Sequence, residues 1–172
     1  AKDRKHRILT SLNLTPEGLE QTNLRLQARL AVVQRNEVRW EEEMTEDAEL
    51  LLVAFGTMGR ICKTALRAAR RAGLKVGLLR PISLWPFPEQ RLYELAGQVQ
   101  RILVVEMNAG QMLNDVRLFT ANRAPVGFFG RMGGIMPLPD EILAEIHRMV
   151  KDPRNQKESV RERWLQRMAE NY

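Results

Sequence analysis

Residues 50–59 read Leu50-Leu51-Leu52-Val53-Ala54-Phe55-Gly56-Thr57-Met58-Gly59, and this stretch decides the fold. Its first six residues form a continuous apolar run, which is typical of a strand buried on both faces. A turn at residues 56–59 follows, and the next residues predict a helix over about 60–72 that ends at Gly73. A buried strand that leads directly into a helix is the opening half of a βαβ unit, so the stretch predicts a parallel sheet.

The same alternation continues along the chain. Further strands are predicted at residues 75–79, 101–106 and 125–129, and further helices at 88–96, at 110–121 and from 139 onward. This pattern favours an α/β fold with three layers, α/β/α, around a mainly parallel sheet. The segment 36–40 is a candidate for an antiparallel edge strand, although helical spacing assigns it to the end of the preceding helix.

Three parts are expected along the chain. Residues 1–47 form a leader with an amphipathic linker helix over about 16–39, because Thr15 and Pro16 are typical of a helix start. Within this leader, residues 40–47 are interpreted as an acidic connector. Residues 48–152 form the α/β domain, and residues 153–172 form a separate helix or tail. Because the chain begins with alanine rather than methionine, we expect it to be a piece of a longer protein.

Bulk properties exclude several classes of protein. No apolar run approaches the roughly 20 residues that span a bilayer, and no secretory signal is visible, so a membrane partner is not expected. Cys62 is the single cysteine, which excludes an internal disulfide and an iron–sulfur cluster held by this chain and favours the cytoplasm. His6 and His147 lie far apart in the sequence and have no companions that indicate a metal site or a catalytic triad.

The net charge of +6 is concentrated in one region, because no acidic residue occurs between Glu49 and Glu89. Arg60, Lys63, Arg67, Arg70 and Arg71 place most of their charge on one side of the predicted helix 60–72. We interpret this side as a solvated face, with docking of an acidic partner as the second interpretation. Nucleic acid is the least favoured partner, because no known binding module or aromatic platform accompanies the charge.

The turn at residues 56–59 has a second interpretation besides a tight connection between strand and helix. Backbone N–H groups at a helix start can hold an anion, and Arg80 follows the next predicted strand. A free-standing nucleotide- or phosphate-binding module is therefore the alternative function. The dinucleotide fingerprint needs a third glycine that is absent here, so the structural interpretation of the turn is preferred.

Three loops are predicted at the carboxyl edge of the sheet, where open α/β sheets bind ligands. They follow the strands ending near residues 79, 106 and 129, and the first carries aromatic residues among prolines. We interpret Glu106 and Asp115 as capping or ion-pairing residues rather than as a catalytic pair. The candidate interface or ligand residues at this edge are Gly56, Thr57, Arg80, Pro81, Trp85, Phe87, Glu106, Asn108, Gly110, Gln111, Gly130, Arg131, Gly133 and Gly134.

The same loops carry a family resemblance. They read Leu78-Leu79-Arg80-Pro81-Ile82-Ser83-Leu84-Trp85-Pro86-Phe87-Pro88, Val104-Val105-Glu106-Met107-Asn108-Ala109-Gly110-Gln111-Met112 and Gly130-Arg131-Met132-Gly133-Gly134. Together with residues 53–57 they resemble the C-terminal part of the α subunit of 2-oxoacid:ferredoxin oxidoreductases. The leader is most similar to the branched-chain, 2-oxoisovalerate members, and the 2-oxoglutarate members are close. One departure is Met136-Pro137-Leu138-Pro139, where family members often have Pro-Thr-Pro, so a threonine N-cap is missing.

The resemblance implies a transketolase C-terminal-like fold with an antiparallel edge strand in an otherwise parallel sheet. It implies that the whole complex uses thiamine diphosphate, magnesium, an iron–sulfur cluster and coenzyme A, none of them held by catalytic, cofactor or metal residues of this chain. The implied partners are the remainder of the α subunit, the β, γ and ferredoxin-like subunits, and ferredoxin. The expected function is that of a non-catalytic structural and interface domain, inactive by itself, in a complex that decarboxylates a 2-oxoacid to an acyl-CoA.

Overall fold

The computed structural model describes Asp3, Ile8 and residues 12–151 and 159–170 of the chain. Chain contacts divide it into two compact units, residues 1–37 and residues 38–172, so the first unit ends before the boundary predicted at residue 47. The first unit contains helix α1 (Pro16–Asn36), whose start is capped by Thr15: its Oγ1 accepts a hydrogen bond from the Gly18 N–H at 3.2 Å. This helix lies where the sequence predicted one but ends at Asn36 rather than at residue 39, and none of its residues is buried.

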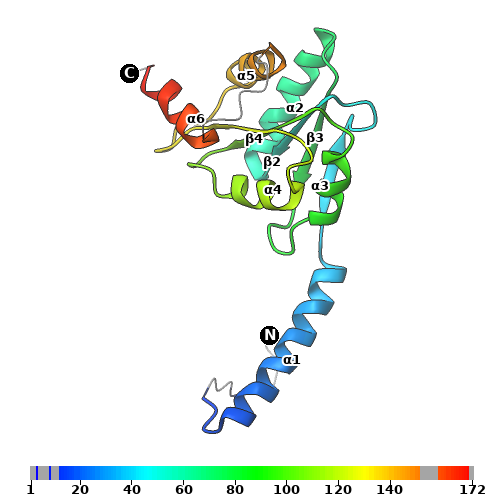
Figure 1. Cartoon of the computed structure of the whole chain (residues 1–172), viewed down its shortest axis with the longest axis vertical. Coiled ribbons are helices and arrows are strands. Elements are labelled where there is room, and N and C mark those ends of the chain that lie inside the picture. Colours follow the sequence, from blue (N-terminus) through cyan, green and yellow to red (C-terminus); the bar gives the residue numbers. More distant parts are fainter. Residues whose placement is uncertain (1–2, 4–7, 9–11, 152–158, 171–172) are drawn as a thin grey trace. The chain divides into compact units, whose positions relative to one another are not determined.

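The second unit alternates strands and helices (Figure 1). Its elements are β1 (Trp40–Glu43), β2 (Leu50–Ala54), α2 (Gly56–Arg71), β3 (Val76–Pro81), α3 (Glu89–Ala96), β4 (Arg101–Glu106), α4 (Met112–Thr120), β5 (Val126–Gly130), α5 (Pro139–Lys151) and α6 (Val160–Ala169). Within the described ranges, no helix combines the length and the apolar character needed to cross a membrane.

The sheet runs in the order β1-β3-β2-β4-β5. β2 pairs in parallel with β3 and β4, β4 pairs in parallel with β5, and β1 lies antiparallel to β3 with Trp40 opposite Pro81. The predicted mainly parallel sheet with an antiparallel edge strand is therefore confirmed. The edge strand occupies residues 40–43 rather than 36–40, so the interpretation of residues 40–47 as a connector was wrong for its first half. An acidic strand is stable at this edge because cations of α2 and α3 face it, as described below.

Helices cover both faces of the sheet. α2 and α5 pack on one face, whereas α3, α4 and α6 pack on the other. Successive residues of β2 point to opposite faces, so that Leu51 belongs to one apolar cluster and Leu52 to the other. This double burial explains the continuous apolar run from which the strand was predicted. Cys62 lies in the cluster under α2, and burial raises the pKa of its thiol to about 12, which keeps it protonated and unreactive at neutral pH.

Three cations on the basic side of α2, Lys63, Arg67 and Arg70, pair with acidic residues of the segment 41–47. Lys63 Nζ lies 3.3 Å from a Glu41 carboxylate oxygen, and Arg70 Nη2 lies 2.7 Å from Asp47 Oδ1. Arg60, Arg67 and Arg71 are exposed, in line with the predicted solvated face, and the ion pairs partly neutralise this face from within the chain. Acidic and basic residues that are separated along the sequence therefore meet in the fold, because the pairing of β1 with β3 brings the acidic segment beside the basic helix.

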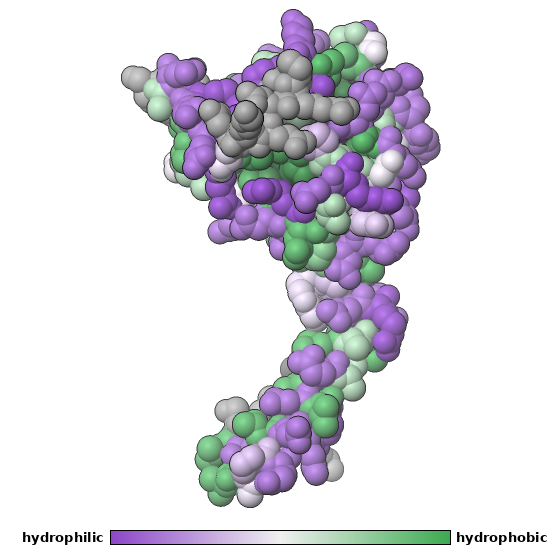
Figure 2. All heavy atoms as spheres, in the orientation of Figure 1, coloured by the Kyte–Doolittle hydropathy of each residue, from purple (hydrophilic) through white to green (hydrophobic). Residues whose placement is uncertain are grey.

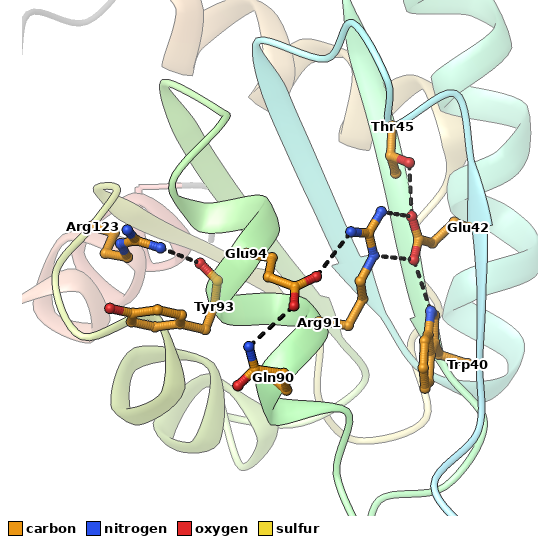
Figure 3. A network of polar contacts seen from close by, with 8 residues as sticks. All are labelled: Trp40, Glu42, Thr45, Gln90, Arg91, Tyr93, Glu94 and Arg123. Carbon is orange, nitrogen blue, oxygen red and sulfur yellow. Dashed lines mark hydrogen bonds and ion pairs between the residues drawn. The ribbon is translucent and has the colours of Figure 1, made fainter.

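Glu42 links β1 to α3 (Figure 3). Its carboxylate accepts hydrogen bonds from Arg91 Nε at 2.7 Å and Nη2 at 2.8 Å, from Thr45 Oγ1 at 2.8 Å and from Trp40 Nε1 at 2.7 Å. The hydrogen bonds from Arg91 are the main cause that lowers the pKa of Glu42 from its ordinary 4.5 to about 2, and partial burial opposes them. The group of donors therefore holds Glu42 in its ionised form.

We expect Glu42 to make folding stability depend on pH between 4.5 and about 2. Its contribution is fully present above its unfolded-state pKa and is lost as the pH falls through the lower folded-state pKa, since protonation breaks the pair with Arg91. Glu42→Gln should therefore flatten the dependence in this window and cost about 1 kcal/mol at neutral pH, because the pair is partly screened by solvent. Urea unfolding at a series of pH values measures both effects. Arg91→Met should flatten the same window, and an unchanged slope in Glu42→Gln would contradict the assignment.

Candidate functional site at the carboxyl edge of the sheet

The strand order places a cavity at the carboxyl edge of the sheet. β3 lies on one side of β2 and β4 lies on the other, so the chain changes direction across the sheet between β2 and β4. Ligand crevices of open α/β sheets form at such a switch point. Here a cavity of about 400 Å³ is lined by residues 55–58 after β2, residues 105–108 at the end of β4, the start of α4 and Leu84.

Five of the residues predicted at the edge line this cavity: Gly56, Thr57, Glu106, Asn108 and Gln111. The first two belong to the opening turn of α2, which begins at Gly56. The sequence placed the helix start near residue 60 because two glycines at 56 and 59 are typical of a turn. The glycine at 59 has a packing reason instead: a Cβ there would lie 2.7 Å from Cδ of the Arg80 side chain, which packs against the helix at this residue.

Glu106 caps helix α4, which decides between the capping and ion-pairing roles that the sequence left open. Its two carboxylate oxygens each accept a hydrogen bond at 2.9 Å, one from the Met112 N–H and one from the Leu113 N–H. The side chain is almost fully buried. Asn108 shapes the loop in front of the same helix, because its Oδ1 accepts hydrogen bonds from the N–H groups of Gly110 at 2.7 Å and Gln111 at 3.0 Å. These polar groups thus serve the backbone of the loop and the helix start.

Arg80 is directed away from the cavity and toward β1. Its Nη1 lies 2.9 Å from Glu41 Oε2, and Lys63 contacts the same carboxylate oxygen at 3.3 Å. Pro81 is the last residue of β3 and pairs with Trp40. Arg80 is therefore paired with an acid of the chain itself, which weighs against its use as a phosphate ligand.

The two aromatic residues predicted as interface residues in the loop after β3 differ in their exposure. Phe87 is 8% exposed and its ring stacks on Phe119 with centroids 5.4 Å apart, whereas Trp85 remains 55% exposed. Ser83 secures the loop, because its hydroxyl donates to the Pro86 carbonyl at 2.6 Å and accepts from the Arg39 N–H at 2.9 Å. Phe87 thus belongs to the core, and Trp85 is presented at the surface.

The loop after β5 is fixed at its start and end. Arg131 pairs with Glu141 in α5, and the other Glu141 oxygen accepts a hydrogen bond from the Leu138 N–H at 2.8 Å. This carboxylate satisfies a backbone donor at the start of α5, where the family resemblance led us to expect the loss of a threonine N-cap. Gly133 and Gly134 lie between these anchors with φ of 66° and 87°, a conformation that favours glycine.

Large apolar side chains are exposed in all the segments that end at this edge. They follow β2, β3, β4 and β5 in turn, and they comprise Phe55, Ile82, Leu84, Trp85, Met107, Met132, Ile135 and Met136. Figure 2 shows hydrophobic side chains, in green, on the lower end of the domain, where the loop after β3 lies in Figure 1. Of these eight residues only Trp85 was predicted from the sequence as an interface residue. The available signal was the repeated occurrence of apolar residues directly after each strand.

The cavity does not fit a phosphate-bearing cofactor. None of its lining residues is a lysine or arginine, and its charged members are the acids Glu106 and Asp115. In the described ranges, no cluster of three His, Cys, Asp or Glu residues could hold a metal ion. Neither thiamine diphosphate nor coenzyme A is therefore assigned to this cavity, whose lining suits an apolar partner better than an anion.

The fold and this edge define a class: a three-layer α/β domain with a five-stranded sheet and an apolar carboxyl edge. The chain belongs to the family described as pyruvate:ferredoxin oxidoreductase core domain II, whose model matches residues 48–142. This finding confirms the predicted family resemblance.

Curated relatives include the ketoisovalerate oxidoreductase subunit VorB of Methanothermobacter marburgensis, 43% identical over 85% of this chain and 41% of the relative. The 2-oxoglutarate synthase subunit KorA of the same organism is 34% identical over 76% of this chain and 35% of its own length. Our chain thus spans less than half of these proteins. A solved 2-oxoglutarate:ferredoxin oxidoreductase from Magnetococcus marinus shares the fold with a TM-score of 0.71 at 21% identity, covering 81% of this chain and 24% of that one.

Proposed function

We propose that this chain is a structural and subunit-interface domain of a thiamine-diphosphate-dependent 2-oxoacid:ferredoxin oxidoreductase. The whole complex oxidatively decarboxylates a 2-oxoacid to an acyl-CoA and reduces ferredoxin. The proposed substrate is 2-oxoisovalerate, because the ketoisovalerate oxidoreductase subunit is 43% identical to this chain and the 2-oxoglutarate synthase subunit 34%.

The apolar carboxyl edge is the observation that carries this proposal. Exposed apolar side chains gathered at one edge of a folded domain mark an interaction site, and here the segments after four strands each contribute such side chains. Permanent interfaces between subunits are more apolar than transient ones, which suits a domain that remains inside a complex. The proposed partners are the remainder of the α subunit and the β, γ and ferredoxin-like subunits, with ferredoxin as the electron acceptor of the assembly.

The chemistry is proposed to lie outside this chain. Thiamine diphosphate, magnesium, the iron–sulfur cluster and coenzyme A are assigned to other parts of the complex, and the cytoplasm is the proposed location. The cavity has no cationic lining residue, and Arg80 is paired with Glu41, which supports an interface over the alternative phosphate-binding module. Calorimetric titration of the chain with NADP and with coenzyme A tests that alternative, and micromolar binding of either would favour it.

The proposed activity is tested on the intact complex by coenzyme A-dependent reduction of a viologen dye. Pyruvate, 2-oxoglutarate, 2-oxoisovalerate and an aryl pyruvate are compared as substrates. We expect the highest kcat/KM with 2-oxoisovalerate and no activity from this chain alone. An intact complex loaded with thiamine diphosphate that reduces no dye with any of the four acids would overturn the proposal.

A further inference from the structure

Helix α6 contacts two of the three loops at the carboxyl edge, although it lies beyond residues 48–142 that match the family model. It packs on β5 at the face of the sheet that α3 and α4 also cover. None of its residues takes part in the strand pairing. Its contacts therefore concern the loops and the core beside them rather than the register of the sheet.

Arg161 of α6 holds the loop after β4. Its guanidinium donates to the Ala109 carbonyl at 2.9 Å, to the Gly110 carbonyl and to Asn114 Oδ1 at 3.2 Å. Gly110 adopts a φ of 94°, and a Cβ there would lie 3.3 Å from Arg161 Nε, so the loop approaches the guanidinium with its backbone. A charged donor on two successive carbonyls fixes the backbone of this loop more strongly than neutral hydrogen bonds would.

Trp164 of α6 holds the start of the loop after β5. Its side chain is 1% exposed, its Nε1–H donates to the Gly130 carbonyl at 3.0 Å, and its ring meets the edge of Phe128 at a centroid distance of 5.0 Å. The β4–β5 ladder continues by one hydrogen bond into the start of these loops, since the Arg131 N–H donates to the Glu106 carbonyl at 3.3 Å. A single helix thus anchors neighbouring loops at two points.

We propose that α6 is a clasp that sets the conformation of the loops 106–111 and 130–134, with Arg161 and Trp164 as its positioning residues. The inference rests on the proposed function in one respect, namely that these loops form part of the docking edge. Helix α6, a part of the domain itself, then keeps these two loops in the conformation that binds the partner. Loss of the clasp loosens the loops, including the Arg131–Glu106 hydrogen bond that follows the last pair of β4 and β5, while the pairing of the strands before it persists.

Amide hydrogen exchange on the full chain tests the clasp. Arg161→Ala should speed exchange of the Gly110 and Gln111 amides roughly tenfold, because three charge-assisted hydrogen bonds are lost. Trp164→Phe keeps an aromatic ring on Phe128 but removes the donor to Gly130, and it should speed exchange of the Arg131 amide severalfold. The matched control is Gln166→Ala, an exposed position on the same helix, which should leave both loops unchanged. Amides of β2 report global unfolding.

The clasp is overturned if the Gly110 and Gln111 amides exchange as slowly in Arg161→Ala as in Gln166→Ala. It is also overturned if Arg161→Ala speeds exchange of the β2 amides as much as that of the loop amides, because this would mean a general loss of stability. The second comparison measures how well the Arg161→Ala and Gln166→Ala variants assemble into the complex. The two variants are compared at the same fraction of folded protein. Weaker assembly of Arg161→Ala than of Gln166→Ala supports the docking role. Loosened loops with unchanged assembly overturn that role alone. A wild-type chain that fails to assemble refutes the proposed function, while the exchange comparison still decides on the clasp.

Discussion

Replacement of Glu106 by alanine is expected to lower the free energy of unfolding by about 3 kcal/mol. The carboxylate is nearly buried and accepts both of its hydrogen bonds from backbone N–H groups at the start of α4. Its removal leaves two donors without a partner in a region that water reaches poorly, and it removes a negative charge from a helix start. Urea unfolding followed by circular dichroism gives the difference.

Two further variants make this prediction specific. Glu106→Gln is expected to cost about 2 kcal/mol, because the amide oxygen still serves one N–H while the amide nitrogen opposes the other. Asp115→Asn removes an exposed carboxylate from the first turn of the same helix and should change stability by less than about 0.5 kcal/mol. A cost for Glu106→Ala as small as that for Asp115→Asn would show that the cap contributes little.

Replacement of Trp85 by alanine is expected to weaken assembly of the complex by about 30-fold, or about 2 kcal/mol. Tryptophan residues at the centre of an interface bury a large apolar area, and Trp85 stands 55% exposed on a loop that Ser83 secures. The isolated chain should lose less than about 1 kcal/mol of stability, because the side chain is not part of the core. The assembled fraction at decreasing protein concentration, measured by mass photometry, gives the effect.

The matched control for Trp85 is Leu118→Ala. Leu118 is 70% exposed but lies near the end of α4, away from the carboxyl edge, so its loss should leave assembly unchanged. Phe87→Ala provides the opposite contrast. This ring packs on Phe119 in the core, so its loss should lower stability by about 3 kcal/mol before any effect on assembly is considered. Equal assembly of the Trp85 and Leu118 variants would place the interface elsewhere.

Several features of the fold could be predicted from residues that are close together in the sequence. The apolar run at β2 predicted a doubly buried strand, because a strand covered on both faces needs no polar side. The alternation of strands and helices predicted the sheet, since parallel strands require crossovers. The loops after the strands predicted a shared edge, and Glu106 was predicted to be either a capping or an ion-pairing residue. These features depend on residues that are close in sequence or on rules of chain connection.

Other features depended on contacts between segments that are distant in the chain. The acidic residues 41–43 have no strand signal of their own; in the structure they pair with β3, and Lys63, Arg80 and Arg91 from later in the chain form ion pairs with Glu41 and Glu42. Likewise, no sequence pattern near residue 164 predicts the contacts of Trp164 with Gly130 and Phe128. The sequence by itself therefore determined the layers, the parallel strands and the edge at which the loops gather. Only the tertiary structure decided which charges pair, which aromatic ring is buried and which helix holds the loops, because these depend on distances that the chain's order does not contain.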